Sequence, residues 1–383
     1  MKKSNYRIVL SRGVSTYLVL VYLAISIGVA LQISGSNWDI IWHGIGNVES
    51  FFTPPHSVIY SGVALAIGSI ILAIILFTVL EQKKGSRSIS PFYFLRPSII
   101  PFSLKLAVIG SLLQLTAGPF DFWWHNQFGF DGLLSPPHSV LASGMLMVAL
   151  GALIGIYTLK RDNNNTLFFP KVCLAIAFAV FLMVAVGMVL MFTLPFSKGQ
   201  YFDFNPDPLA AVAAASIVIP FLIGLSLFSA ARVTSMPFIF TSITAIIMII
   251  QSTTTIISNS YFVGIFPFYL LNIFPAVLAD IILQYRRGEG ITLIPASNTT
   301  VKRYLIASII VPLFFTTLFF PWSVDVYGGF FKPSDNIRTE KFFIQLLMPV
   351  IIPIVIPLSA VSSMAGEYLI LRLMNANKMN SMF

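Results

Sequence analysis

The chain contains only four histidines, and all four belong to two copies of one short pattern. In each copy an aspartate is followed by a histidine four residues later and by a second histidine thirteen residues after that. Neutral imidazole and carboxylate are ligands for copper, zinc or iron, and two histidines with one carboxylate form a familiar open site for oxygen chemistry. The pattern therefore predicts metal ligands at six positions: Asp39, His43, His56, Asp121, His125 and His138.

The two copies are part of a longer internal repeat. Residues 36–62 align without a gap with residues 118–144, at an offset of 82, and ten of the 27 positions are identical. Glu49 and Asp131 are equivalent acidic residues in this alignment and are candidate additional metal ligands. Upstream, Gln32 matches Gln114, and we expect these amides to hydrogen-bond to the ligands and orient them.

Short helices must bring each set of ligands together. Gly118 is expected to end one membrane span and Pro119 to start a short outer helix. In the first copy Ser36 and Asp39 resemble a capping box, which predicts a separate helix start there too. Aspartate and histidine four residues apart then share one helix face. A Pro-Pro pair opens the following span, so that the second histidine lies in its first turn, facing back toward the outer helix.

The composition places these elements in a membrane. Of the 383 residues, 57% are hydrophobic and only 10% are charged, which is too little polar surface for a water-soluble protein of this size. A single cysteine excludes an internal disulfide framework. The predicted fold is an all-α polytopic membrane protein with about ten transmembrane helices in a lipid bilayer.

Ten apolar stretches are each long enough to cross the hydrocarbon core. The last one contains Pro349, Pro353 and Pro357, which predict a kink or a break, and a break would make eleven spans. The expected spans are 17–35, 56–80, 99–118, 138–159, 170–194, 208–231, 237–258, 261–284, 303–322 and 345–371.

Charge sets the expected orientation. The net charge of +9 would suit a nucleic-acid partner, but nineteen of the 23 Lys and Arg residues fall on one side of the predicted spans. This positive-inside bias predicts that both termini are cytoplasmic, in a multi-pass protein of the plasma membrane. The Asp/His motifs then lie at the extracytoplasmic face, and the basic charge needs no nucleic acid to explain it.

The repeat suggests three units, namely a first repeat unit over 1–80, a second over 81–162, and a six-span bundle over 163–383. Two spans separate the copies, so both have the same orientation in the membrane and form a parallel repeat. If the two units pack about a twofold axis normal to the membrane, their ligands converge. The alternatives of one dinuclear centre and two separate sites both remain open at the level of sequence.

The spacing Asp-x3-His-x12-His resembles the metal motif in one of the membrane subunits of the copper membrane monooxygenases, the particulate methane and ammonia monooxygenase family. The resemblance implies that the six motif residues bind copper and that the protein is related to a monooxygenase subunit that acts with partner membrane subunits. Two departures stand out. The monooxygenase subunit has one motif instead of two. Its neighbouring metal position uses an asparagine and a further histidine, and this chain has no histidine outside its two motifs.

Three functions compete on these observations. The first is a metal-dependent membrane oxidoreductase, or a subunit of one, acting on a small apolar or weakly polar substrate. The second is a transporter or metal-handling permease that uses the same residues as a binding station. The third is a non-catalytic scaffold in which the repeat is a hydrogen-bonded clasp. A bis-histidine haem, which would leave both aspartates unexplained, and a proton path are lesser alternatives. A transporter needs a continuous polar track, for which the candidates are Gln251, Asn272, Asp280 and Glu367.

Overall fold

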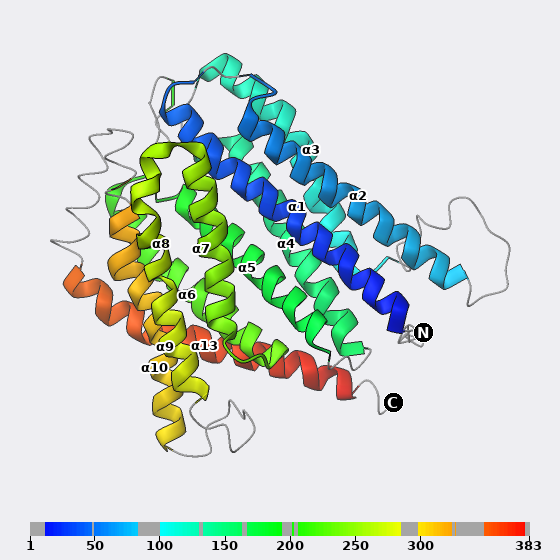
Figure 1. The fold of residues 1–383 in the computed structure, drawn as a ribbon, viewed down its shortest axis with the longest axis vertical. Helices are drawn as coiled ribbons and strands as arrows, with labels where there is room; N and C mark the ends of the chain where they lie inside the picture. Colours follow the sequence, from blue (N-terminus) through cyan, green and yellow to red (C-terminus); the bar gives the residue numbers. More distant parts are fainter. Residues whose placement is uncertain are drawn as a thin grey trace.

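The computed structural model describes residues 12–47, 50–82, 100–129, 133–162, 167–193, 201–202, 206–284, 298–323, 326 and 348–379. Over this part of the chain the regular structure is helical (Figure 1). The α-helices are α1 (Arg12–Gly44), α2 (Pro54–Gln82), α3 (Phe102–Phe128), α4 (Pro136–Asp162), α5 (Phe168–Met191), α6 (Pro208–Thr234), α7 (Ile239–Ser258), α8 (Phe266–Leu271), α9 (Ile273–Gln284), α10 (Asn298–Phe314) and α13 (Met348–Met379). A 3-10 helix η2 (Ser260–Ile265) precedes α8, and a π-helical turn η3 (Phe315–Phe319) follows α10.

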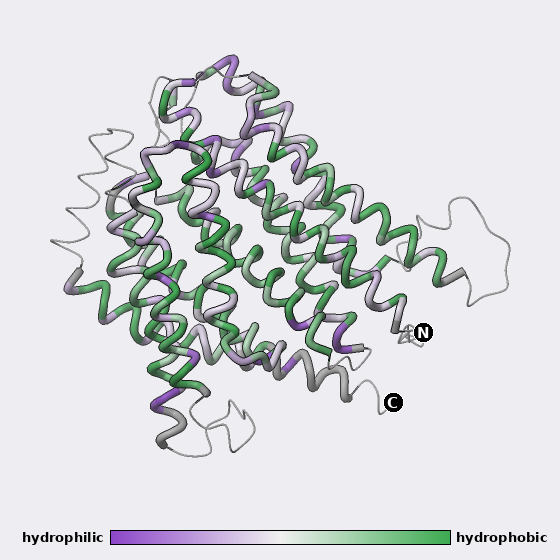
Figure 2. Tube along the Cα trace, viewed as in Figure 1, coloured by the Kyte–Doolittle hydropathy of each residue, from purple (hydrophilic) through white to green (hydrophobic). Residues whose placement is uncertain are grey.

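Ten helical segments within the described residues are long and apolar enough to cross a membrane, which confirms the all-α polytopic prediction. The eighth runs over α8 and α9, and the ninth over α10 and η3. Figure 2 shows that the middle parts of the helices are mostly hydrophobic. Because a bilayer offers no hydrogen-bond partners, a helix that pairs its own backbone groups is the expected way for this chain to cross it.

The last span is one helix. Pro353 and Pro357 lie inside α13, and Pro349 is in its first turn, where its missing N–H costs nothing. The eleven-span alternative is therefore wrong. A membrane helix can lose single backbone hydrogen bonds at proline and still continue, because neighbouring helices and local adjustments compensate.

The first four helices form two tightly packed pairs, α1 with α2 and α3 with α4. Gly28 of α1 faces Gly62 of α2 so closely that a Cβ added at Gly28 would lie 2.7 Å from the Gly62 carbonyl oxygen. Gly110 and Gly144 make the same crossing in the second pair, where the added Cβ would lie 2.6 Å from the carbonyl oxygen. Small residues at such crossings let backbones approach closely, as is typical of membrane helices.

The two pairs also pack against each other and against the rest of the bundle. Helix α1 contacts α4, α5 and α7, and the Tyr22 hydroxyl is 2.8 Å from the Ser103 hydroxyl at the start of α3. One hydrophobic core includes residues from both repeat units and from the C-terminal helices. The repeat units are thus distinct helix pairs within a continuous core, and the three-unit division of the chain stays a prediction.

In the C-terminal bundle, Asp280 shows how a buried carboxylate is used structurally. It is only 2% exposed, and it accepts hydrogen bonds from the backbone N–H groups of Phe240 and Thr241 and from the Thr241 hydroxyl. These groups begin helix α7, whose first N–H groups have no partner within the helix. Asp280 on α9 therefore caps α7, a helix forty residues away in the sequence.

Candidate metal centre

Both sets of ligands lie where two helices meet at one end of the bundle. Asp39 and His43 are on the last two turns of α1, and His56 is in the first turn of α2. The second set repeats this arrangement at the end of α3 and the start of α4. The Pro-Pro pairs do open α2 and α4, as predicted, and they direct both second histidines back toward the aspartates.

The predicted separate outer helices are not present. Helices α1 and α3 continue without interruption from the membrane span through the ligands, and Pro119 lies inside α3. The Ser36 hydroxyl donates to the Gln32 carbonyl, 3.0 Å away within α1, and so does not cap a new helix. Pro119 removes only one backbone hydrogen bond, which the close packing of α3 on α4 tolerates.

Within the first triad, Asp39 stands between two imidazoles. Its carboxylate oxygens lie 3.4 Å from His43 Nε2 and 3.3 Å from His56 Nε2. In the second triad Asp121 Oδ1 lies 3.5 Å from His125 Nε2 and 3.1 Å from His138 Nε2. The six side chains are between 5% and 17% exposed, so each triad is largely shielded from solvent.

These separations suit a shared metal ion. Donor atoms bound at about 2.1 Å in tetrahedral or octahedral geometry lie roughly 3.0–3.4 Å apart. A charge-assisted hydrogen bond between imidazole and carboxylate is shorter, at about 2.7–2.9 Å. Within the described residues, the buried oxygens Asp39 Oδ1 and Asp121 Oδ1 accept no hydrogen bond of standard geometry, although histidine nitrogens lie 3.1–3.5 Å from them.

The orientation of two rings adds a chemical constraint. His56 Nδ1 is 3.0 Å from the Ser50 carbonyl oxygen, and His125 Nδ1 is 3.1 Å from the Gly129 carbonyl oxygen. A carbonyl only accepts, so Nδ1 carries the proton, and in the neutral ring Nε2 presents a lone pair to the carboxylate. Two electron-rich atoms facing each other need a cation between them, either a proton or a metal ion.

The two triads meet. The rings of His43 and His125, which are equivalent residues of the repeat, lie 5.7 Å apart between centroids. Within the second triad, the rings of His125 and His138 lie 5.4 Å apart. In each triad the three ligand atoms lie within 4.8 Å of one another. Contact between a residue and its own copy is what a twofold axis between the repeat units produces. The short distance between these two rings agrees with the hypothesis that the two units bring their ligands together.

The other four predicted site residues are not seen to take part in the triads. Glu49 and Asp131 lie outside the described residues. Gln32 and Gln114 do not orient the ligands, because neither amide has a hydrogen-bond partner in the described part of the chain. Each lies seven residues before its aspartate, which is about 10 Å along a helix and out of reach. Backbone carbonyls near the helix ends, which no sequence motif marks, contact the histidines instead.

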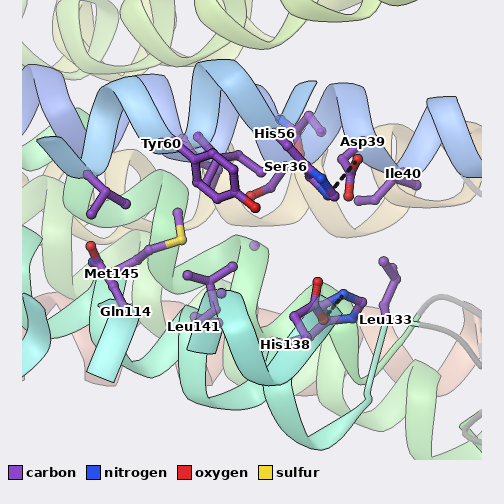
Figure 3. A pocket seen from close by; sticks show the side chains of 18 of the residues that line it. Ser36, Asp39, Ile40, His56, Tyr60, Gln114, Leu133, His138, Leu141 and Met145 are labelled. Carbon is purple, nitrogen blue, oxygen red and sulfur yellow. Dashed lines mark ion pairs between the residues drawn. The ribbon is translucent and has the colours of Figure 1, made fainter. Parts of the chain in front are cut away.

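Both triads border one cavity of about 340 Å3 (Figure 3). Asp39, His43, His56, Asp121 and His138 line it. The other walls are mostly aliphatic side chains and methionines from α1 to α5. Two smaller cavities, of about 110 and 70 Å3, are lined mostly by residues that follow α4 in the sequence. Asn37 and Ile40 line both the first and the 110 Å3 cavity, and Gln251 lines both of the smaller ones.

Comparisons with known proteins found no matching family model, no matching curated protein and no matching solved structure. The fold and the site define a class: a multi-pass helical membrane protein with two Asp/His triads at one end of its bundle.

Proposed function

We propose that this protein is an integral membrane metalloprotein whose two triads hold a dinuclear metal centre. The observation that carries the proposal is the meeting of the two triads, with equivalent histidines 5.7 Å apart at the border of a shared cavity. Copper is the first candidate, with zinc and iron as alternatives, because all three accept imidazole nitrogen and carboxylate oxygen.

Burial supports a metal ion over a purely structural clasp. Two carboxylates near the membrane are costly unless a cation compensates them. Three of the four N–O separations, at 3.3–3.5 Å, are longer than the charge-assisted hydrogen bonds expected of a clasp, and the fourth is 3.1 Å. Each triad offers three ligands and leaves positions on the metal open, which is typical of catalytic rather than structural sites.

The centre suits an oxidoreductase, or a subunit of one, that acts on a small apolar or weakly polar substrate. The resemblance of the Asp-x3-His-x12-His spacing to the copper membrane monooxygenases supports this interpretation, and the largely apolar cavity beside the triads agrees with it. Bound copper or iron would supply the oxygen chemistry. A monooxygenase also needs electrons from outside the site, which is consistent with partner membrane subunits.

The charge pattern supports the orientation that goes with this function. The nineteen basic residues on one side support an orientation with the triads at the extracytoplasmic face of the plasma membrane and both termini in the cytoplasm. A metal centre there would take its ion and its substrate from outside the cell or from the outer half of the bilayer.

A transporter or metal permease is the second candidate, and one observation favours it. The eighth span is interrupted at Asn272, between α8 and α9, and Gln251 and Asn272 line the 70 Å3 cavity. Interrupted helices form ion sites in many transporters. Uptake of copper, zinc or iron into proteoliposomes, abolished by His43→Ala, would favour this function over an oxidoreductase.

Metal content per chain tests the proposal directly. Protein purified in mild detergent should contain one or two copper, zinc or iron ions by elemental analysis, with two for a full dinuclear centre. The double variant His43→Ala/His125→Ala removes one imidazole from each triad and should lose them. Asn126→Ala is the matched control, since Asn126 is exposed, adjoins His125 and bonds only within α3 in the described structure.

Each result has a defined meaning. Metal in the wild type and in Asn126→Ala, but not in the double variant, would establish the site, and copper would strengthen the monooxygenase resemblance. A wild-type protein that holds no metal even after incubation with each ion would overturn the proposal. The scaffold function, with its hydrogen-bonded clasp, would then be favoured.

A further inference from the structure

Besides the triads, the cavity is lined by the polar side chains of Ser36, Asn37, Tyr60 and Gln114. Gln114 lines it and is 3% exposed, yet neither its amide nitrogen nor its amide oxygen has a hydrogen-bond partner in the described part of the chain. Leaving a buried amide unpaired is costly, so such a group points to a ligand or to water that completes it. An amide can both donate and accept, which suits a hydroxyl group.

The position of Gln114 relative to the metal ligands is fixed by helix geometry. Gln114 and Asp121 are seven residues apart on α3, close to two full turns, so they lie on the same face about 10 Å from each other. In Figure 3 Gln114 lies beside Met145 at one end of the cavity, with Leu141 between them and His138. The cavity therefore has an amide at one end and the triads at the other, and the walls between them are mostly aliphatic, with Tyr60 and Ser36 as polar exceptions.

The size of the cavity limits what it can hold. About 340 Å3 is near the lower end of the 300–1,000 Å3 typical of small-molecule sites. The walls offer apolar contacts from Leu141, Met145 and Val184, among others. A neutral molecule with a short hydrocarbon body and one hydrogen-bonding end matches the volume, the mostly apolar lining and the unpaired amide of Gln114.

We infer that this cavity binds a small amphiphile of the short-chain alcohol class, with its hydroxyl on the Gln114 amide and its hydrocarbon chain directed toward the triads. As a binding chamber it stands on the cavity and on Gln114 alone. As a substrate site it rests on the proposed metal centre, because only then does the far end of the molecule meet a reactive group.

The repeat provides an internal control. Gln32 is the copy of Gln114, is fully buried, and also has no hydrogen-bond partner in the described part of the chain. It packs on Gly62 as Gln114 packs on Gly144. However, Gln32 does not line the cavity. A purely structural role of these amides would make the two substitutions equivalent, whereas a binding role makes them different.

The test is photolabelling with a diazirine analogue of n-hexanol, with adducts located by peptide mass spectrometry. We expect labelling of α4 near Leu141 and Met145 that excess n-hexanol prevents and n-hexane prevents less well. Gln114→Met keeps a linear side chain of similar length and should weaken competition by n-hexanol about three- to tenfold, the loss of one or two hydrogen bonds. Gln32→Met should leave it unchanged. Size-exclusion profiles and thermal unfolding would show that both variants fold.

Several outcomes would overturn the inference: no displaceable label at the cavity, equal effects of the two substitutions, or equal competition by n-hexane and n-hexanol in the wild type. The last comparison requires no variant. Labelling is repeated on protein stripped of metal by a chelator. If the protein binds no metal but is labelled as expected, the metal centre is refuted and the binding chamber is still supported. The two proposals can therefore fail separately.

Discussion

At the scale of single residues, the different roles of the two ring nitrogens, Nδ1 and Nε2, determine what the histidines can bind. His56 and His125 are held through Nδ1 by backbone carbonyls and direct Nε2 toward a carboxylate. Fixing one nitrogen determines the tautomer and leaves the other as a ligand, which is how metal-binding histidines are commonly held. The interpretation of the triads as metal sites depends on the aspartates and the histidines together.

A spectroscopic prediction belongs at this scale. Copper(II) added to metal-free protein should occupy both triads, and because His43 and His125 lie 5.7 Å apart, the two ions should be magnetically coupled in electron paramagnetic resonance. His125→Ala should leave only the spectrum of an isolated ion in the Asp39 triad. Uncoupled spectra at two ions per chain would instead indicate separate sites.

At the scale of helices, the site depends on how closely each pair packs. The close crossing of α1 and α2 at Gly28 and Gly62 helps to bring His56 to Asp39. The same crossing at Gly110 and Gly144 supports the second triad. Sequence periodicity shows that these helices exist, but a glycine in an apolar span does not reveal which helix it faces.

Substitution at a crossing should therefore damage a site that it does not touch. Gly28→Val places methyl groups against the α2 backbone, which should cost about 1–3 kcal/mol of stability and reduce metal binding by the first triad. Gly68→Val on α2 is the control, because a Cβ there meets nothing within 4 Å. Thermal unfolding and metal content would be compared, and equal effects of the two substitutions would argue against the crossing as a support.

At the scale of the whole molecule, much of the architecture could be predicted from the sequence. A lipid bilayer requires every span to be long and apolar, so the ten spans can be predicted from the apolar stretches of the sequence. The alignment at an offset of 82 residues reveals the repeat. The continuity of α1 and α3 could not be predicted, because Gly118 and Pro119 read as breaks in isolation. The capping of α7 by Asp280 depends on packing between distant segments, which no local pattern records.

Metal should stabilise the entire bundle. The ligands come from four helices, and an ion that binds only the folded state raises its stability by mass action. Removing the metal with a chelator should lower the thermal unfolding temperature by on the order of 5 °C, and returning it should reverse the change. The double variant His43→Ala/His125→Ala should show no response to chelator, and a response in that variant would place the ion elsewhere.

The parallel repeat has a consequence for how the site can change over time. In a symmetric dimer of one helix pair, every substitution appears twice, on both sides of the axis. Here both copies lie in one chain, so each can vary alone. Pro119 stands where the first copy has Asn37, and Gln114 lines the cavity whereas its copy Gln32 does not. Because each copy can vary alone, the second copy contributes its glutamine to the cavity and the first does not, while both copies keep an Asp/His triad.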